Sequence, residues 1–293
     1  MNGLADARVW RAAALLGASM IFIGAAATNP ATAEPGALPK LKTATAAAFD
    51  RYVASTEERN SAELKSGAPF LGPDALPENE RRAAYESLRA GVTRIEKRKT
   101  LDAGGEIRCP NGLIHHWEAI AFIKGVKVDD VLRVLEDYDH HSEYYKPDVE
   151  RSKTLEHDGD HYRAFLRFRR HKVITVVLNT THDVNYFRDS PQRAHSRSSG
   201  IKIAEVENAG KPDEKEKPAG DDDGFLWRME TWWRMEERDG GVYIQSEVVS
   251  LTRDIPTGLG WMIGAFVNGI PKETLAFTME ATRRAVLAKQ TSH

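Results

Sequence analysis

The fold is decided by the stretch FLWRMETWWRME, which runs from Phe225 to Glu236. Large apolar side chains alternate there with charged ones, and Thr231 is the polar member of the apolar row. Alternation with a period of two residues is typical of a β-strand that has one buried face and one solvated face. We therefore expect a half-buried strand whose core-facing row is Phe225, Trp227, Met229, Thr231, Trp233 and Met235.

Similar patterns on both sides of this stretch predict a large antiparallel sheet. His115–Ile123 places small apolar residues beside large ones on one face. Turn-forming sequences at Asp158-Gly159 and at Asp239-Gly240-Gly241 indicate two hairpins. The other expected strands are Arg151–Leu155, Tyr162–Arg169, Val173–Val184, Ala194–Val206 and Val242–Leu251.

Helical patterns lie before and after these strands. Val128–Leu135 and His140–Tyr145 are expected to be short helices, and Pro271 suits the first turn of a long final helix. The side chains that this last helix is expected to turn toward the sheet are Leu275, Phe277, Met279 and Val286. The sequence thus predicts an α+β fold in which a curved antiparallel sheet wraps around a long C-terminal helix. Such an arrangement leaves a space between sheet and helix, and such spaces usually hold small apolar molecules.

Two motifs within Leu113–Leu287 carry a resemblance to a known family. The first is VLRVLEDYD, Val131–Asp139, followed by Tyr144-Tyr-Lys-Pro147, and the second is Leu251-Thr-Arg-Asp-Ile-Pro256. Together with the order of the elements, they resemble the START-like helix-grip superfamily, also called the polyketide cyclase/dehydrase and lipid transport group. The resemblance implies the helix-grip fold. Members include lipid carriers, ligand-sensing receptors, quinone-binding proteins and a minority of cyclases, so the fold does not choose among these functions.

The beginning of the chain has the features of a signal peptide. Arg8 and Arg11 precede the apolar segment Ala12–Ala27, and the small-residue triplet Ala31-Thr-Ala33 follows it. A retained membrane anchor is the less favoured alternative, because a span needs about 20 apolar residues. We expect residues 1–33 to be a signal peptide and the protein to be periplasmic or secreted.

The rest of the chain divides into an extension and a main domain. Residues 34–110 are expected to be a tether and a helical extension, with helices at Thr43–Leu64 and Glu78–Ala90, and residues 111–290 to be the START-like ligand-binding domain. Asn208–Asp223 contains almost nothing apolar and is expected to be a solvated loop.

The overall composition excludes some classes of partner. The chain has 293 residues and a net charge of −2, and it shows no basic stripe, so we expect no nucleic acid to bind. Its single cysteine, Cys109, cannot form an internal disulfide. A cationic cluster at a strand end could attract an anionic headgroup or a carboxylate, although a solvated hairpin is the favoured interpretation; its members are Arg167, Arg169, Arg170, His171 and Lys172.

Metal binding and catalysis are both less favoured than simple binding. His140 and His141 point to different sides of a helix, and His157 and His161 flank a turn, whereas a metal site needs three or four convergent donors. No metal and no cofactor are therefore expected.

An enzyme of the cyclase or dehydrase kind is the runner-up function. It would pair one of two histidines with a carboxylate for proton transfer. The candidates are His116 and His141 with Glu118, Asp139 or Glu247.

The favoured function is binding or carrying a hydrophobic or amphipathic small molecule, such as a lipid or a quinone, without catalysis. Aromatic rows often simply fill a core, but Ala119, Ala121 and Thr231 would leave volume beside them. A scaffold that binds a partner through the N-terminal helices and the acidic loop is a third possibility. The residues expected to form the ligand site are Trp117, Tyr144, Tyr145, Trp227, Thr231, Trp233 and Phe266.

The apolar run Ile255–Val267, which contains three glycines and Trp261, has two interpretations. If it is exposed, it is a gate that contacts a membrane transiently through Trp261. If it is buried, it forms the first turns of the final helix. The buried interpretation is favoured.

Overall fold

The computed structural model describes residues 40–67, 69–171, 174–254 and 260–291, with backbone only for residues 260–268. The helices are α1 (Thr43–Ser66), α2 (Glu78–Arg89), α3 (Val128–Leu135), α4 (His141–Tyr144) and α5 (Gly260–Gln290), with 3₁₀ turns η1 (Gly72–Ala75) and η2 (Tyr138–His140). The strands are β1 (Arg94–Lys97), β2 (Leu101–Asp102), β3 (Gly105–Glu106), β4 (Gly112–Lys124), β5 (Val149–Asp158), β6 (His161–His171), β7 (Thr175–Ser190), β8 (Arg193–Glu207), β9 (Lys215–Glu216), β10 (Arg228–Arg238) and β11 (Gly241–Arg253).

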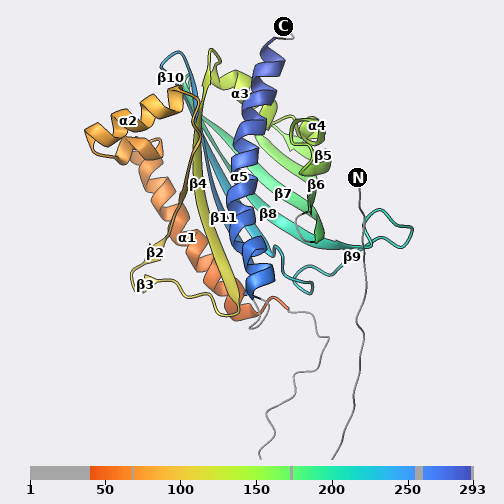
Figure 1. Ribbon diagram of the computed structural model, residues 1–293. Helices are drawn as coiled ribbons and strands as arrows, with labels where there is room; N and C mark the ends of the chain where they lie inside the picture. The colour runs from red at the N-terminus through yellow and green to blue at the C-terminus, as the bar shows by residue number, and fades with distance from the viewer. Residues whose placement is uncertain (1–39, 68, 172–173, 255–259, 292–293) are drawn as a thin grey trace, which may run out of the picture. The chain divides into compact units, whose positions relative to one another are not determined.

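One antiparallel sheet dominates the described part of the chain. Its strand order is β1-β4-β11-β10-β8-β7-β6-β5, with β9 paired to β8 at the side. The sheet curves around α5, while α1 and α2 lie against the opposite face (Figure 1). The predicted α+β helix-grip architecture is therefore confirmed.

The inner face of the sheet follows from alternation along neighbouring strands in register. On β10, Trp233 pairs with Ser246 of β11 and with Ser196 of β8. Because paired residues point to the same face, these three side chains form one row across the sheet. Beyond this row, the main apolar core joins the sheet to α3 and α5.

The outer face of β11 and of the second half of β10 is not solvated, which corrects the half-buried strand that the sequence predicted. Arg234 and Glu236 of β10 are each only 5% exposed. The N-terminal extension covers this face, and Phe49 and Tyr52 of α1 pack on Trp232 and Val249. Both faces of the central strands are therefore buried.

Two further elements differ from expectation. The final helix begins at Gly260, so Pro271 lies inside it and not in its first turn. The segment after Asn208 is mostly exposed, as a solvated loop should be, but it also contains β9, and its Glu214 accepts two hydrogen bonds of 2.8 Å from Arg167. The side chain of Arg167 is only 2% exposed and that of Glu214 is 26% exposed, so this arginine belongs to a partly buried ion pair and not to a solvated hairpin.

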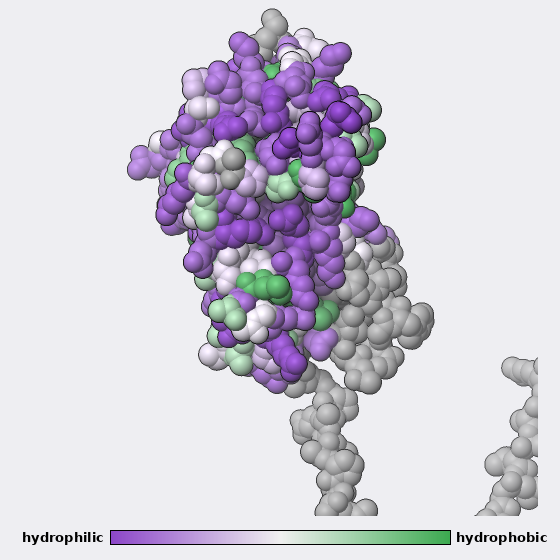
Figure 2. All heavy atoms as spheres, turned by 90° about the vertical axis from the view of Figure 1, so that its left-hand side faces the viewer, coloured by the Kyte–Doolittle hydropathy of each residue, from purple (hydrophilic) through white to green (hydrophobic). Residues whose placement is uncertain are grey.

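The surface over α1 and α2 is mostly hydrophilic, with small apolar patches (Figure 2). None of the helices in the described ranges combines the length and the apolar character that crossing a membrane requires.

Candidate ligand-binding cavity

A cavity of about 290 Å³ lies between the inner face of the sheet and α5. Most of its wall is apolar, and strands β4, β6, β7, β8, β10 and β11 contribute to it. α5 contributes residues three or four apart, among them Ile270, Thr274 and Thr278, because that spacing brings side chains to one helix face. The cavity therefore occupies the position that a helix-grip fold predicts.

One end of the cavity is closed by the apolar core. Ser196, Trp233 and Ser246 line the cavity, whereas Met235 and Ile244 in the next row of the sheet are fully buried and do not. The other end is bordered by a smaller apolar cluster that contains Val176, Leu178, Phe225, Leu226 and Ile270.

Four of the predicted ligand-site residues line this cavity. Trp117 lies on β4, Thr231 and Trp233 lie on β10, and Tyr145 follows α4. The side chain of Phe266 lies outside the described residues, as does that of Trp261. The ligand-binding role of all these residues remains a prediction.

Trp227 was wrongly placed by the sequence pattern. It packs on the outer face with Phe49 and Tyr52, and its Nε1 donates a hydrogen bond of 2.8 Å to Asp222. The regular register of β10 with β11 begins at Arg228, and the backbone hydrogen bonds from Trp227 to Leu251 and from Arg253 to Gly224 do not follow it, so the alternation does not extend back to Trp227.

Tyr144 also differs from its predicted place at the mouth of the cavity. Its hydroxyl donates a hydrogen bond of 2.5 Å to Asp137, which also accepts a 2.5 Å bond from Lys289. It is not among the residues that line the cavity. The reason is that adjacent residues on a short helix point in different directions, and Tyr145 takes the inward one.

The tyrosines of the cavity wall bond to groups of the protein itself. Tyr186 donates to the carbonyl oxygen of Leu135 at 2.9 Å, and Tyr138 donates to Tyr186 at 2.8 Å. Tyr145 donates to Thr282 at 3.0 Å, since the Thr282 hydroxyl itself donates to a backbone carbonyl. Burial raises the pKa of Tyr145 to about 12, so its hydroxyl stays protonated.

Two histidines of the wall are neutral. Burial lowers the pKa of both His141 and His182 to about 4. Thr180 donates to the carbonyl oxygen of Leu166, so it accepts its 2.9 Å bond from Nε2 of His182. His141 donates from Nε2 to the carbonyl oxygen of Val134 at 3.1 Å.

An ion pair supplies the charge in the described wall. Arg170 donates to Asp148 at 2.9 Å and to Thr274 of α5 at 2.8 Å. Burial raises the pKa of the Asp148 carboxyl, while the positive charge of Arg170 opposes the rise. The two charges compensate each other, so the wall carries no net charge from this pair.

The predicted acid–base pair of His116 and Glu247 does form, but on the other face of the sheet. His116 donates from Nε2 to Glu247 at 2.6 Å and accepts a 2.9 Å bond from the hydroxyl of Tyr52. Glu247 is also bound by Arg59 and by Asn60 of α1. The cluster lies between α1 and the sheet, away from the cavity wall.

Burial and pairing set the charges of this outer cluster. Burial acts to raise the pKa of Glu247, but the hydrogen bond from His116 and the charge of Arg59 lower it to about 2. Burial lowers the pKa of His116 despite its bond to Glu247. Nearby, burial raises the pKa of Glu118 to about 7. The cluster therefore binds the extension to the sheet through a neutral histidine and an ionised carboxylate.

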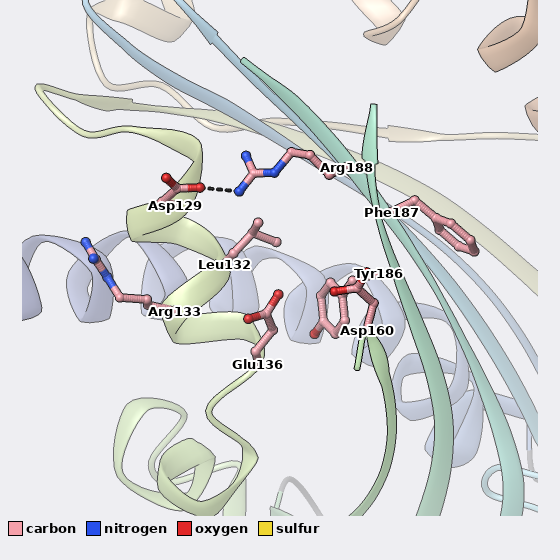
Figure 3. A pocket seen from close by; sticks show the side chains of 8 residues that line it. All are labelled: Asp129, Leu132, Arg133, Glu136, Asp160, Tyr186, Phe187 and Arg188. Carbon is pink, nitrogen blue, oxygen red and sulfur yellow. Dashed lines mark hydrogen bonds and ion pairs between the residues drawn. The ribbon is translucent and has the colours of Figure 1, made fainter. Parts of the chain in front are cut away.

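A second hollow of about 280 Å³ lies outside the cavity, between α3 and β7 (Figure 3). Its wall is mainly charged, and Arg188 forms an ion pair with Asp129 across it. The ring of Tyr186 borders both this hollow and the cavity. The residues that line the hollow are Asp129, Leu132, Arg133, Glu136, Asp160, Tyr186, Phe187 and Arg188.

No family model matches the chain, and no curated protein matches it. The described part of the chain has a helix-grip fold, in which a curved antiparallel sheet surrounds one long C-terminal helix. This assignment rests on the strand order and on the position of α5.

Similar solved structures include a STAR-related lipid transfer protein from Xanthomonas axonopodis, with 17% sequence identity and a TM-score of 0.43, covering 66% of this chain and 98% of that one. The Zhui aromatase/cyclase from Streptomyces sp. R1128 has 16% identity and a TM-score of 0.35, over 60% of this chain and 93% of that one. A START superfamily protein from Mycobacterium smegmatis has 10% identity and a TM-score of 0.36, over 60% of this chain and 97% of that one.

Proposed function

We propose that this protein binds an apolar or amphipathic small molecule in the cavity between the sheet and α5 and carries it without chemical change. The observation that carries the proposal is the mostly apolar cavity of about 290 Å³. This volume is near the lower end of the range typical of small-molecule pockets, about 300–1,000 Å³. It suits one compact molecule.

The energetics of the cavity support a bound molecule. Most of the cavity wall is apolar, so a ligand that covers it removes apolar surface of both molecules from water. Such burial contributes roughly 25 cal/mol per Å² of apolar surface.

The arrangement of titratable groups favours binding over catalysis. A general base must reach the substrate and must have a pKa near the working pH. The pKa of His141 and of His182 is lowered to about 4 by burial, and Asp148 is paired with Arg170. The pair of His116 and Glu247 lies on the opposite face of the sheet. A cyclase-type enzyme remains the alternative that the experiment below also tests.

We further propose that the protein acts after export, in the periplasm or outside the cell. The support is the sequence of residues 1–33, with two arginines, an apolar segment and an Ala-x-Ala end. N-terminal sequencing of the protein from cell fractions tests this. Cleavage near Ala33 is expected, and an uncleaved cytoplasmic protein would contradict it.

The test of the binding function is native mass spectrometry of the protein purified from its own envelope fraction. We expect a bound lipid-like or quinone-like mass that dissociates unchanged. Val248→Trp fills the cavity, because Val248 lines it on β11, and should abolish the bound mass. Leu155→Trp is the matched control, because Leu155 is 48% exposed on β5, and should leave the mass unchanged.

Two results would contradict the proposal. One is a protein that carries no small molecule and takes none up from an envelope lipid extract, which would favour a scaffold. The other is conversion of the bound molecule during incubation, which would favour an enzyme.

A further inference from the structure

Several polar groups of the cavity wall have no partner within the protein. Nε1 of Trp117, Oγ of Ser196 and Oγ of Ser246 are buried and form no hydrogen bond with any residue that the structure describes. Ser196 and Ser246 are each 1% exposed. The tyrosines and histidines of the wall, by contrast, bond to other groups of the protein.

The register of the sheet brings these unpaired groups together. Ser196 and Ser246 lie on the two strands beside Trp233 and pair with it. Trp117 pairs with Val248 in the neighbouring row of the same, cavity-facing side of the sheet. Thr231 lies in that same row, because it pairs with Val248 and with Ser198. The side chain of Thr231 likewise forms no hydrogen bond among the described residues. We call Trp117, Ser196, Thr231 and Ser246 the neutral polar wall.

Unpaired polar groups at these positions lower the stability of the folded protein, whereas apolar residues of the same size would not. Burying a hydroxyl or an indole N–H without a partner leaves its desolvation uncompensated. Valine has nearly the shape of threonine, and alanine nearly that of serine. Three such buried groups on one wall of one cavity, with the part-exposed hydroxyl of Thr231 beside them, therefore point to a partner that enters the cavity.

The chemistry of the neutral polar wall restricts that partner. An indole N–H can only donate, and a hydroxyl can donate or accept, so an oxygen acceptor satisfies both. The four residues of the neutral polar wall carry no charge. The charged residues that line the cavity, Asp148 and Arg170, bond to each other at 2.9 Å near Val176, although Oδ2 of Asp148 and Nε of Arg170 have no hydrogen-bond partner among the described residues. Lys272 lies 5.9 Å from the ring centroid of Trp117, but it is exposed and does not line the cavity. A carboxylate or ammonium group placed against the neutral polar wall would therefore have no residue of opposite charge beside it, and at the other end Arg170 and Asp148 already neutralise each other.

We infer that the ligand is a neutral, oxygen-bearing apolar molecule, such as a ketone, a quinone or an alcohol, whose oxygen lies against the neutral polar wall. The inference rests on the proposed binding function and adds the chemical class of the ligand and its orientation. The oxygen lies toward the closed end, at the rows of Trp233 and Thr231. The hydrocarbon lies along α5 toward the cluster of Phe225 and Ile270.

The test uses four probes of ten carbons that differ only in their polar group: 2-decanone, 1-decanol, decanoate and decylammonium. Affinity is measured at pH 7 by the change in intrinsic tryptophan fluorescence, because Trp117 and Trp233 line the cavity. Native mass spectrometry checks that one probe molecule binds. We expect the ketone and the alcohol to bind at least about tenfold more tightly than either ion.

Matched variants assign the preference to the neutral polar wall. Thr231→Val and Ser246→Ala remove one hydroxyl each with little change of shape, and each should weaken 2-decanone binding about fivefold while decanoate binding stays the same. Tyr145→Phe is the control, because the hydroxyl of Tyr145 already bonds to Thr282. It should leave the order of the four affinities unchanged.

The outcomes separate this inference from the binding function. If the four probes bind equally, or if decanoate binds most tightly, the inference is wrong and the binding function stands. It is also wrong if both hydroxyl-removing variants keep the full ketone affinity. If no probe binds at millimolar concentration and the native protein carries no small molecule, both proposals fail.

Discussion

On β11, Glu247 points toward α1 whereas Ser246 and Val248 point toward α5, so neighbouring residues of one strand belong to two different environments. On the outer face, charged side chains are tightly paired under the N-terminal extension. On the inner face, neutral polar groups have no partner and border open space. Ionisable groups thus attach the N-terminal extension to the sheet on the outer face, whereas on the inner face the neutral polar wall carries no charge and the ion pair of Asp148 and Arg170 lies at the other end of the cavity.

The largest expected effect comes from breaking the outer cluster. Arg59→Met removes the cation bound to Glu247, which is only 4% exposed. Leaving a buried charge without its partner typically costs about 3–5 kcal/mol. We expect a loss of that size in urea denaturation, with probe binding in the cavity retained. Arg51→Met is the control, because Arg51 pairs with Asp102 at the surface with 57% of its side chain exposed, and it should change stability by less than about 1 kcal/mol.

The next largest effect is a difference in stability loss between two Met→Ala variants, one in the filled part of the inner face and one beside the cavity. Met235→Ala, in the fully buried core, should lower the free energy of unfolding by about 2–4 kcal/mol. Met229→Ala should cost about 1 kcal/mol, because Met229 already borders the cavity and leaves a smaller new void. Equal losses for the two variants would show that the two parts of the inner face are equally packed.

The pH dependence of stability tests the outer face without changing its packing. Burial raises the pKa of Glu118 to about 7 in the folded protein, above its ordinary value. The protonated form is therefore favoured by folding, so its contribution is fully present at low pH and is lost as the pH rises toward 7. Glu118→Gln should be more stable than the natural protein by about 1–3 kcal/mol at pH 8. The difference should vanish near pH 4, and a pH-independent difference would contradict the assignment.

The smallest expected effect is at the charged hollow between α3 and β7. Arg188→Ala removes the ion pair with Asp129, whose two side chains are 40% and 66% exposed. Exposed ion pairs contribute roughly 0–1 kcal/mol. We expect a stability change within about 0.5 kcal/mol and unchanged binding in the cavity. A loss of binding would mean that the hollow and the cavity act as one site.

The sequence predicted the fold well because the relevant signals are local. Alternation on β10 and the turns at Gly159 and Gly240 depend on neighbouring residues, and they placed Thr231 and Trp233 correctly on the inner face. The prediction for Trp227 was wrong because the regular strand register begins only at Arg228, and a sequence period of two cannot show where that register begins.

The outer face could not be predicted in the same way. Arg59 and Glu247 are 188 residues apart, and charged residues along a strand look solvated until their partners are known. Ser196 and Ser246 were missed for a similar reason, because serine in a strand usually indicates a wet face. They are buried because strand pairing places them beside Trp233, and the pattern along one strand does not show which residues of the neighbouring strands it pairs with.

Because β11 is covered on both faces, its backbone amides can be reached by solvent only when the fold opens. Eleven of its thirteen positions, all except Val248 and Arg253, are buried, and both of its neighbours are paired along its length. Amide protons in such a strand exchange with solvent only when the whole unit opens. Isotope exchange measured at Tyr243 or Val249 should therefore report the global opening free energy directly, and the addition of a ligand should slow it in proportion to occupancy.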